Sequence, residues 1–312
     1  MRVVWAVALV SVLTLAAPAA ADAHLRIGEV AVDARVTITS RQTTFAVHVR
    51  QSDRSFRLTV EPGHRVVVLG YLDEPFLRLD DRGVAVRPAS PTAAEAGLVE
   101  PGDRGQAGWK LSPRRTAVWR DPRVQRLAPG VSRLHWSVPV IVDGRPGTIA
   151  GELVRVGRPS VLAWAAFVGA VVALAGCLAI GRRHKRLGAG CIALGGVSSA
   201  AALVTAGAFA VDAGAPGTRI AAVYALVLVA PAAAALVFAP PVARVPAGIW
   251  LAVIGVTTTL VDTGMFFHGY VLSALPAALT RAAGALAIGA GLGGTLLGGL
   301  FFADGGYETI AP

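Results

Sequence analysis

The chain has 312 residues, of which 54% are hydrophobic and only 15% charged, and its formal net charge is +10. This hydrophobic share is too high for a soluble protein of this length and indicates a membrane protein. Binding to nucleic acid would need a basic cytoplasmic face with interleaved aromatic side chains, and the sequence has no such segment. The composition therefore points to the lipid bilayer as a partner and excludes nucleic acid.

The start of the chain has the pattern of a secretory signal peptide. Arg2 precedes a short apolar run and then a stretch of small residues. The rule of small residues around the cleavage site leaves two positions open, after Ala21 and after Ala23. An uncleaved anchor is the alternative, but the apolar run is short for a span of about 20 residues. We therefore expect residues 1–23 to be a signal peptide and residues 24–158 to be exported.

Residues 24–158 are rich in arginine and carry the pattern of β-strands. Residues 44–50 and 55–60 alternate between apolar and polar, as half-buried strands do. Between turn sequences, further strands are predicted at residues 65–71, 76–79, 84–87, 116–119, 133–142 and 148–156. Residues 88–112 have no period and are predicted to be a long loop. Short strands at these spacings predict an all-β antiparallel sandwich.

The second half of the chain is almost continuously apolar. Five runs reach the length of about 20 residues that a hydrocarbon core requires. They are residues 160–180, 187–211, 219–239, 247–267 and 282–303. We therefore predict an all-α membrane bundle of five transmembrane helices over residues 159–303. The basic cluster 182–186 indicates a cytoplasmic loop, which agrees with export of residues 24–158 and leaves the tail 304–312 in the cytoplasm.

Asp262 is the one acidic residue within a predicted span, toward its outer end, and Arg281 is expected at a similar depth. Ionisable groups at such positions are rare and often functional. A polar cluster around them, open to the outside, would suit a small-solute or ion transporter. Alternatively, Asp262 reaches the interface or pairs with Arg281 to fix helix packing. Against transport, five helices give no even inverted repeat.

The β-rich half carries several short motifs: Gly70-Tyr71, Glu74-Pro75-Phe76-Leu77-Arg78, Ser90-Pro91, Trp119, Trp136-Ser137-Val138-Pro139 and Gly144-Arg145-Pro146. Together they resemble those of a family of uncharacterised actinobacterial exported multi-pass membrane proteins. The resemblance implies a β domain followed by membrane helices. Relatives often carry His-Asp-His after the tryptophan, whereas Arg120-Asp121-Pro122 follows Trp119 here. Any site built on that motif is therefore expected to be lost or altered.

A looser resemblance is to exported copper-binding sandwiches fused to membrane segments. It implies that cleavage after Ala23 would expose His24, whose amine and imidazole would chelate copper, and neutral imidazoles suit copper. A second ligand would come from His48, His64 or His135. These histidines show no ligand spacing, and a solvated histidine is ordinary on a polar strand position.

No catalytic constellation stands out in the sequence, and we predict neither an enzyme nor a required cofactor. The carboxylates at Asp73-Glu74 and Asp80-Asp81 lie in turns, where aspartate is favoured for local hydrogen bonding. We expect a binding or scaffold domain of the cell envelope with an envelope protein as partner. Its most distinctive surface would contain Glu74, Arg78, Trp119 and Trp136, although core packing explains the tryptophans equally well.

Overall fold

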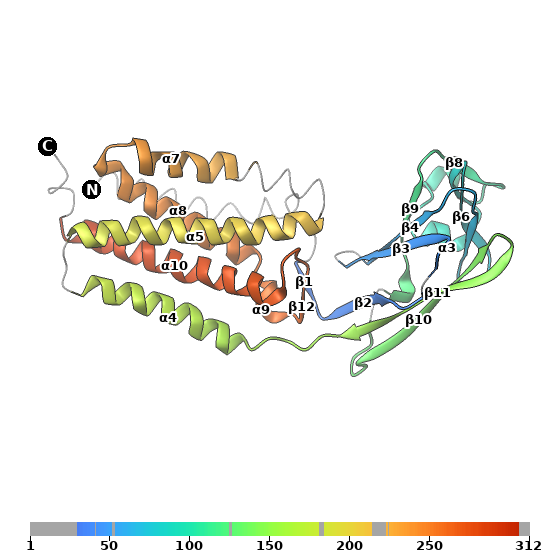
Figure 1. Cartoon of the computed structure of the whole chain (residues 1–312), viewed down its shortest axis with the longest axis horizontal. Coiled ribbons are helices and arrows are strands. Elements are labelled where there is room, and N and C mark those ends of the chain that lie inside the picture. The colour runs from blue at the N-terminus through green and yellow to red at the C-terminus, as the bar shows by residue number, and fades with distance from the viewer. Residues whose placement is uncertain are drawn as a thin grey trace. The chain divides into compact units, whose positions relative to one another are not determined.

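The structure is a computed structural model that describes residues 30–305 except 41, 52–53, 125–126, 181–183, 214–222 and 224 (Figure 1). The chain divides into two compact units. Residues Val32–Gly157 form one, called here the β unit, and Ala31 together with the residues from Arg158 onward forms the helical unit. The signal peptide, His24 and residues 306–312 lie outside the described residues, so what the sequence predicts for them stays a prediction.

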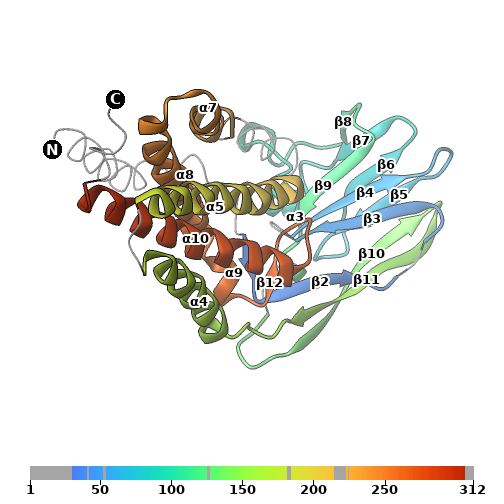
Figure 2. The same cartoon turned by 60° about the vertical axis from the view of Figure 1, so that its left-hand side comes forward.

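The β unit consists of two antiparallel sheets (Figure 2). The larger has the strand order β2 (Ala34–Ile38), β11 (Arg145–Arg155), β10 (Arg133–Val142), β5 (Val66–Leu69), β6 (Pro75–Asp80), β7 (Gly83–Val86) and β8 (Lys110–Ser112). The smaller has the order β3 (Phe45–Arg50), β4 (Ser55–Val60) and β9 (Thr116–Arg120). Apolar side chains from both sheets form a single core. The predicted antiparallel β region is confirmed.

Three aromatic side chains form the centre of this core. Phe56 of β4 stacks on Trp119 of β9 with ring centroids 5.2 Å apart. Trp136 of β10 meets Phe56 edge-on, also at 5.2 Å. Phe56 and Trp119 come from the smaller sheet and Trp136 from the larger one, so these rings join the two sheets. Gly151 of β11 leaves the space for Trp136, because a Cβ there would lie 2.3 Å from the indole ring.

The first and last strands of the β unit are neighbours in the larger sheet. Ala34 of β2 pairs with Arg155 of β11. One residue further out, the Val156 N–H donates to the Asp33 carbonyl oxygen at 2.9 Å. The chain therefore enters and leaves the β unit side by side.

The outer edge of β2 is closed by a side chain. The Gln51 carboxamide accepts a hydrogen bond from the Val36 N–H at 2.9 Å and donates one to the Val36 carbonyl at 2.7 Å. These are the two bonds that a further strand would make with Val36.

Among the described residues of the β unit, five short elements were not predicted: β2, β8, α3 and two 3₁₀ turns, Pro101–Asp103 and Pro122–Val124. Strand β2 shows the buried alternation of Ala34 and Val36, and β8 forms the far edge of the larger sheet. Helix α3 (Pro91–Glu95) interrupts the predicted loop. The Ser90 side chain caps α3 by accepting from the Ala93 N–H, and a proline at the first helical position is favourable. The Ser90-Pro91 pair was therefore a start signal for a helix.

The helical unit contains four helices that are long and apolar enough to cross a membrane, among the residues that the structure describes. These are α4 (Val161–Ala179), α5 (His184–Ala213), α8 (Pro241–Val261) and α10 (Ala277–Ala303). They correspond to four of the five predicted spans. At the position of the third predicted span, a π-helical segment (Ala225–Val229) leads into the shorter helix α7 (Ala230–Phe238). Five spans therefore remain a prediction, while four are compatible with the structure.

Small residues allow the long helices to approach each other closely. A Cβ on Gly195 of α5 would lie 2.1 Å from the Gly248 carbonyl oxygen of α8, so both positions need glycine. On α10, Gly289 and Gly293 lie against α4, where added Cβ atoms would meet Val171 and Ala175 at 2.8 and 2.6 Å. Glycines are thus the contact points of α10 and α5 with their neighbours.

The end of the helical unit that contains the α8–α10 connection is covered by short elements. Helix α9 (Gly264–Phe267) follows α8, and strand β12 (Tyr270–Val271) pairs with β1 (Ala31–Val32). The Leu272 N–H donates to the Val30 carbonyl oxygen at 2.9 Å. Val30 also packs against the apolar cluster around Met265 and Phe266.

Candidate functional site

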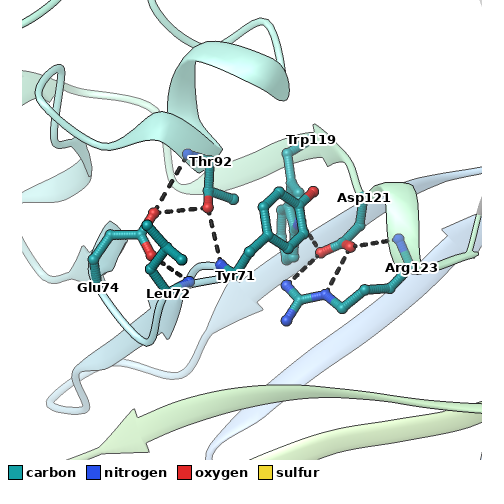
Figure 3. Close-up of polar contacts among 7 residues, drawn as sticks. All are labelled: Tyr71, Leu72, Glu74, Thr92, Trp119, Asp121 and Arg123. Carbon is teal, nitrogen blue, oxygen red and sulfur yellow. Dashed lines mark hydrogen bonds and ion pairs between the residues drawn. The ribbon is translucent and has the colours of Figure 1, made fainter.

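The turn that joins β5 to β6 carries Tyr71, Leu72 and Glu74 (Figure 3) and is closed by two backbone hydrogen bonds. The Gly70 N–H donates to the Glu74 carbonyl oxygen at 2.7 Å, and the Asp73 N–H donates to the Gly70 carbonyl at 3.3 Å. Asp73 has a φ of 58°, in the left-handed region, which aspartate tolerates better than most residues. Tyr71 and Leu72 therefore occupy the tip of a closed three-residue loop.

The Glu74 side chain ties this turn to the first turn of α3. Its Oε1 accepts hydrogen bonds from Ser90 Oγ and Thr92 Oγ1, each at 2.7 Å. Its Oε2 accepts from the Leu72 N–H at 3.0 Å. Thr92 Oγ1 in turn accepts from the Tyr71 N–H at 3.0 Å (Figure 3). The backbone of the turn is thereby fixed at both tip residues.

These donors make Glu74 an unusually strong acid. Partial burial acts in the opposite direction, but the hydrogen bonds from Thr92, Ser90 and the backbone outweigh it and lower the pKa of Glu74 to about 2. The side chain is therefore a carboxylate throughout the physiological range.

Gly70 provides the space in which these bonds form. A Cβ at this position would lie 2.2 Å from Thr92 Oγ1 and 2.3 Å from Glu74 Oε1. Its φ is not left-handed, so the requirement for glycine is one of volume and not of backbone conformation. The Gly70-Tyr71 motif is thus explained by the close approach of two side chains.

A second carboxylate, Asp121, lies on the other side of Tyr71. It is buried, and its Oδ1 and Oδ2 accept from Nε and a terminal nitrogen of Arg123 at 2.8 and 2.7 Å. Asp121 Oδ2 also accepts from the Trp119 indole N–H at 3.3 Å. The Arg123 guanidinium lies 5.0 Å from the centroid of the Tyr71 ring, a cation–π distance (Figure 3). The Tyr71 ring is therefore held by a guanidinium that is itself fixed.

The tip of the turn presents apolar surface. Leu72 is 75% exposed and Tyr71 37% exposed. The pKa of Tyr71 is raised, mainly because part of the phenol is buried and secondarily because the carboxylates of Asp121 and Glu95 are nearby. Its hydroxyl therefore stays protonated. We call Gly70–Glu74 with its contacts to Thr92 and Arg123 the braced turn. It combines a fixed backbone with an exposed aliphatic and an exposed aromatic side chain.

Four residues were predicted to form the distinctive surface of the β unit, and of these Glu74 lies in the braced turn. Trp119 and Trp136 lie in the core, only 2% and 5% exposed, which matches their alternative interpretation as packing residues. The indole nitrogen of Trp136 has no hydrogen-bond partner among the described residues. Arg78 lies 5.1 Å from the Trp109 ring, and its Nε is 3.3 Å from Asp80 Oδ2, an ion pair whose geometry falls short of a hydrogen bond.

The candidate copper ligands are not brought together. His64 Nδ1 contacts Asp143 Oδ2 at 2.7 Å beside the β10–β11 turn, whereas His135 lies near the other end of β10, beside Glu152 at 3.5 Å. Seven strand residues separate these positions, which corresponds to roughly 23 Å. His48 lies on the smaller sheet opposite Arg57. Within the described ranges, no group of three His, Cys, Asp or Glu side chains is placed to hold a metal, and His24 lies outside those ranges.

Arg281 does not pair with Asp262 in the described structure. Its guanidinium instead donates to the carbonyl oxygens of Met265, His268 and Gly269 at 2.7, 2.8 and 2.9 Å. Asp262 follows the last residue of α8, and no described side chain pairs with its carboxylate. Arg281 therefore satisfies backbone groups that α9 and the following turn leave unbonded.

Sequence reasoning missed most partners of the braced turn. Thr92, Asp121 and Arg123 carry no motif that links them to Glu74 or Tyr71. The available signal was the Ser90-Pro91 helix start, which would have placed the hydroxyls of Ser90 and Thr92 together near the beginning of the predicted loop. The close contacts themselves depend on how the loops fold back.

Comparison of the chain with protein-family models, curated proteins and solved structures gives no match. The resemblance to the actinobacterial family therefore stays a prediction.

We predict that Glu74→Gln lowers the free energy of unfolding of the β unit by about 2 kcal/mol at neutral pH, because hydrogen bonds to a charged acceptor are replaced by weaker ones. The effect should depend on pH. The folded pKa is depressed, so the stabilisation is complete above the ordinary glutamate pKa of 4.5 and is lost as the pH falls towards about 2. Pulse proteolysis in urea on the full-length protein measures this. Glu95→Gln, at an exposed carboxylate on α3, is the control, and an equal loss in both variants would contradict the assignment.

Gly70→Ala is expected to destabilise the β unit by about 2 kcal/mol through overpacking against Thr92 and Glu74. Gly102→Ala is the matched control, because nothing lies within 4 Å of a Cβ there and its φ is not left-handed. Urea unfolding of both variants tests the prediction. A Gly70→Ala protein as stable as the control would show that the turn can relax without loss.

Arg281→Gln should destabilise the helical unit by about 3 kcal/mol, because three carbonyl oxygens lose a charged donor. Arg244→Gln is the control, since Arg244 donates to a single carbonyl, that of Ala239. Thermal unfolding of the detergent-solubilised protein compares them. Equal stabilities of the two variants would argue against a structural role for Arg281.

Proposed function

We propose that the chain is an integral membrane protein of the cell envelope whose exported β unit is a non-enzymatic binding or scaffold domain. The helices serve as its anchor. Four span-length apolar helices support the anchor. The signal-peptide pattern and the basic cluster 182–186 support export of the β unit.

The observation that carries this proposal is the braced turn. Binding sites that are fixed before the partner arrives avoid part of the entropy loss of association. Tyrosine is also among the residues that contribute most to protein interfaces, especially beside residues that exclude water. Tyr71 and the 75% exposed Leu72 on a fixed backbone fit this description, so we infer a protein partner with an apolar pocket for Leu72.

The chemistry of the turn favours binding over catalysis. Both oxygens of Glu74 accept hydrogen bonds, and a carboxylate with a pKa of about 2 is a weak general base at neutral pH. The Asp121 carboxylate is bonded by Arg123 and Trp119. The polar groups of the turn therefore act on its own structure.

A photo-crosslinking amino acid at position 72 should capture one envelope protein in the native host. The same amino acid at Leu111, which is 53% exposed on β8, is the control. We expect the yield at position 72 to exceed that at position 111 by roughly tenfold if Leu72 lies in the centre of an interface. Adding Gly70→Ala should lower the yield at position 72. Equal labelling at both positions would overturn the proposal that the turn is the contact surface.

A further inference from the structure

The strand register gathers arginine side chains at the end of the β unit where the chain enters and leaves. Arg35 of β2 pairs with Val154 of β11, and Val154 pairs with Arg133 of β10. The next pair out on β2 and β11 is Ala34 with Arg155. These residues therefore lie at one end of three neighbouring strands. We call this region the tether end, and it is defined by Arg35, Arg50, Val131, Arg133, Leu134 and Arg155.

Arg50 joins the tether end through its neighbour. The Gln51 side chain bonds to the backbone of Val36, which places the end of β3 beside Val36. Val36 pairs with Leu153, and Leu153 pairs with Leu134. The smaller sheet thus adds its own arginine at the level of Leu134.

The tether end is exposed, basic and partly apolar. All its defining residues are exposed, including the aliphatic Val131 and Leu134. The Arg155 guanidinium is directed along the end by hydrogen bonds to the carbonyls of Val131 and Ala128, both at 3.0 Å. Among the described residues here, the acids are Glu152, 3.2 Å from Arg133, and the half-buried Asp33, whose carbonyl accepts from the Val156 N–H. They are outnumbered by the four arginines that define the tether end.

The opposite end of the β unit has a different charge pattern. It contains the β10–β11 turn at Asp143-Gly144 and the β6–β7 turn at Asp81-Arg82. There Arg65, Arg82 and Arg145 are accompanied by Glu61, Asp80, Asp81 and Asp143. Positive charge is therefore concentrated at the tether end.

We propose that the tether end docks onto the anionic phospholipid headgroups of the membrane that the helices cross. The chain continues from β11 into α4 through residues 156–160 alone, and an extended segment of this length spans about 20 Å. Headgroup phosphates are therefore within reach of the arginines. Arginine binds phosphate well, and exposed aliphatic side chains beside it suit the interfacial region. This surface is separate from the braced turn and does not depend on the function proposed for it.

The test uses full-length protein in nanodiscs of phosphatidylcholine, with or without about 30 mol% phosphatidylglycerol to supply anionic headgroups. Cys177→Ala and Cys191→Ala remove the native thiols. A fluorophore is placed at Ser132→Cys, at the tether end, or at Glu61→Cys, at the opposite end. Spin-labelled headgroups in both kinds of disc quench the fluorophore on contact.

We expect strong quenching at position 132 in anionic discs, weak quenching there in neutral discs, and weak quenching at position 61 in both. Arg35→Gln with Arg133→Gln should lower the ratio of docked to undocked protein about 25-fold, since each arginine near an anionic surface contributes about a fivefold factor. Arg82→Gln with Arg145→Gln removes the same charge from the opposite end and should leave quenching unchanged. Equal quenching at position 132 in the two discs, or equal effects of the two double variants, would overturn the proposal.

Discussion

The pairing of β2 with β11 is the constraint on which the rest of the β unit depends. It brings the first and last strands of the unit together, so both connections to the helical unit leave from one end. The register of β10 against β11 is set by their two-residue turn at Asp143-Gly144, where both φ angles are positive, and it places Trp136 against Phe56 in the core. The charge pattern at the two ends follows from these two strand pairs together.

In both units, side chains form hydrogen bonds with buried polar groups that lie outside regular secondary structure or between helices. In the β unit, the carboxylates of Glu74 and Asp121 accept hydrogen bonds in loops that form no backbone hydrogen bonds of a sheet. In the helical unit, the Ser198 hydroxyl donates to the Ala287 carbonyl at 2.7 Å and the Trp250 indole to the Leu228 carbonyl at 3.2 Å. The second bond reaches the π-helical segment before α7, where the helical ladder is irregular. In lipid, no water would replace these bonds.

The periodicity of apolar residues was sufficient to predict strands and long helices, because these depend on residues close together in the sequence. The alternation of Phe56 and Leu58 with polar residues marked β4, and continuous apolar runs marked the long helices. The candidate site depends on contacts between distant residues, such as Glu74 with Thr92 or Tyr71 with Arg123. The same limit applies to Arg281, since an arginine that bonds carbonyls and one that pairs with Asp262 look identical in sequence.

The closure of β2 by Gln51 has a consequence for self-association. An open edge strand offers its N–H and C=O groups to a second copy of the same sheet, which is a common route to aggregation. At Val36 both groups are already bonded to a side chain of the same molecule. A second molecule would have to displace the Gln51 amide before it could extend the seven-stranded sheet there. Gln51 thus disfavours edge-to-edge pairing of two copies through Val36, at the β2 edge of the larger sheet.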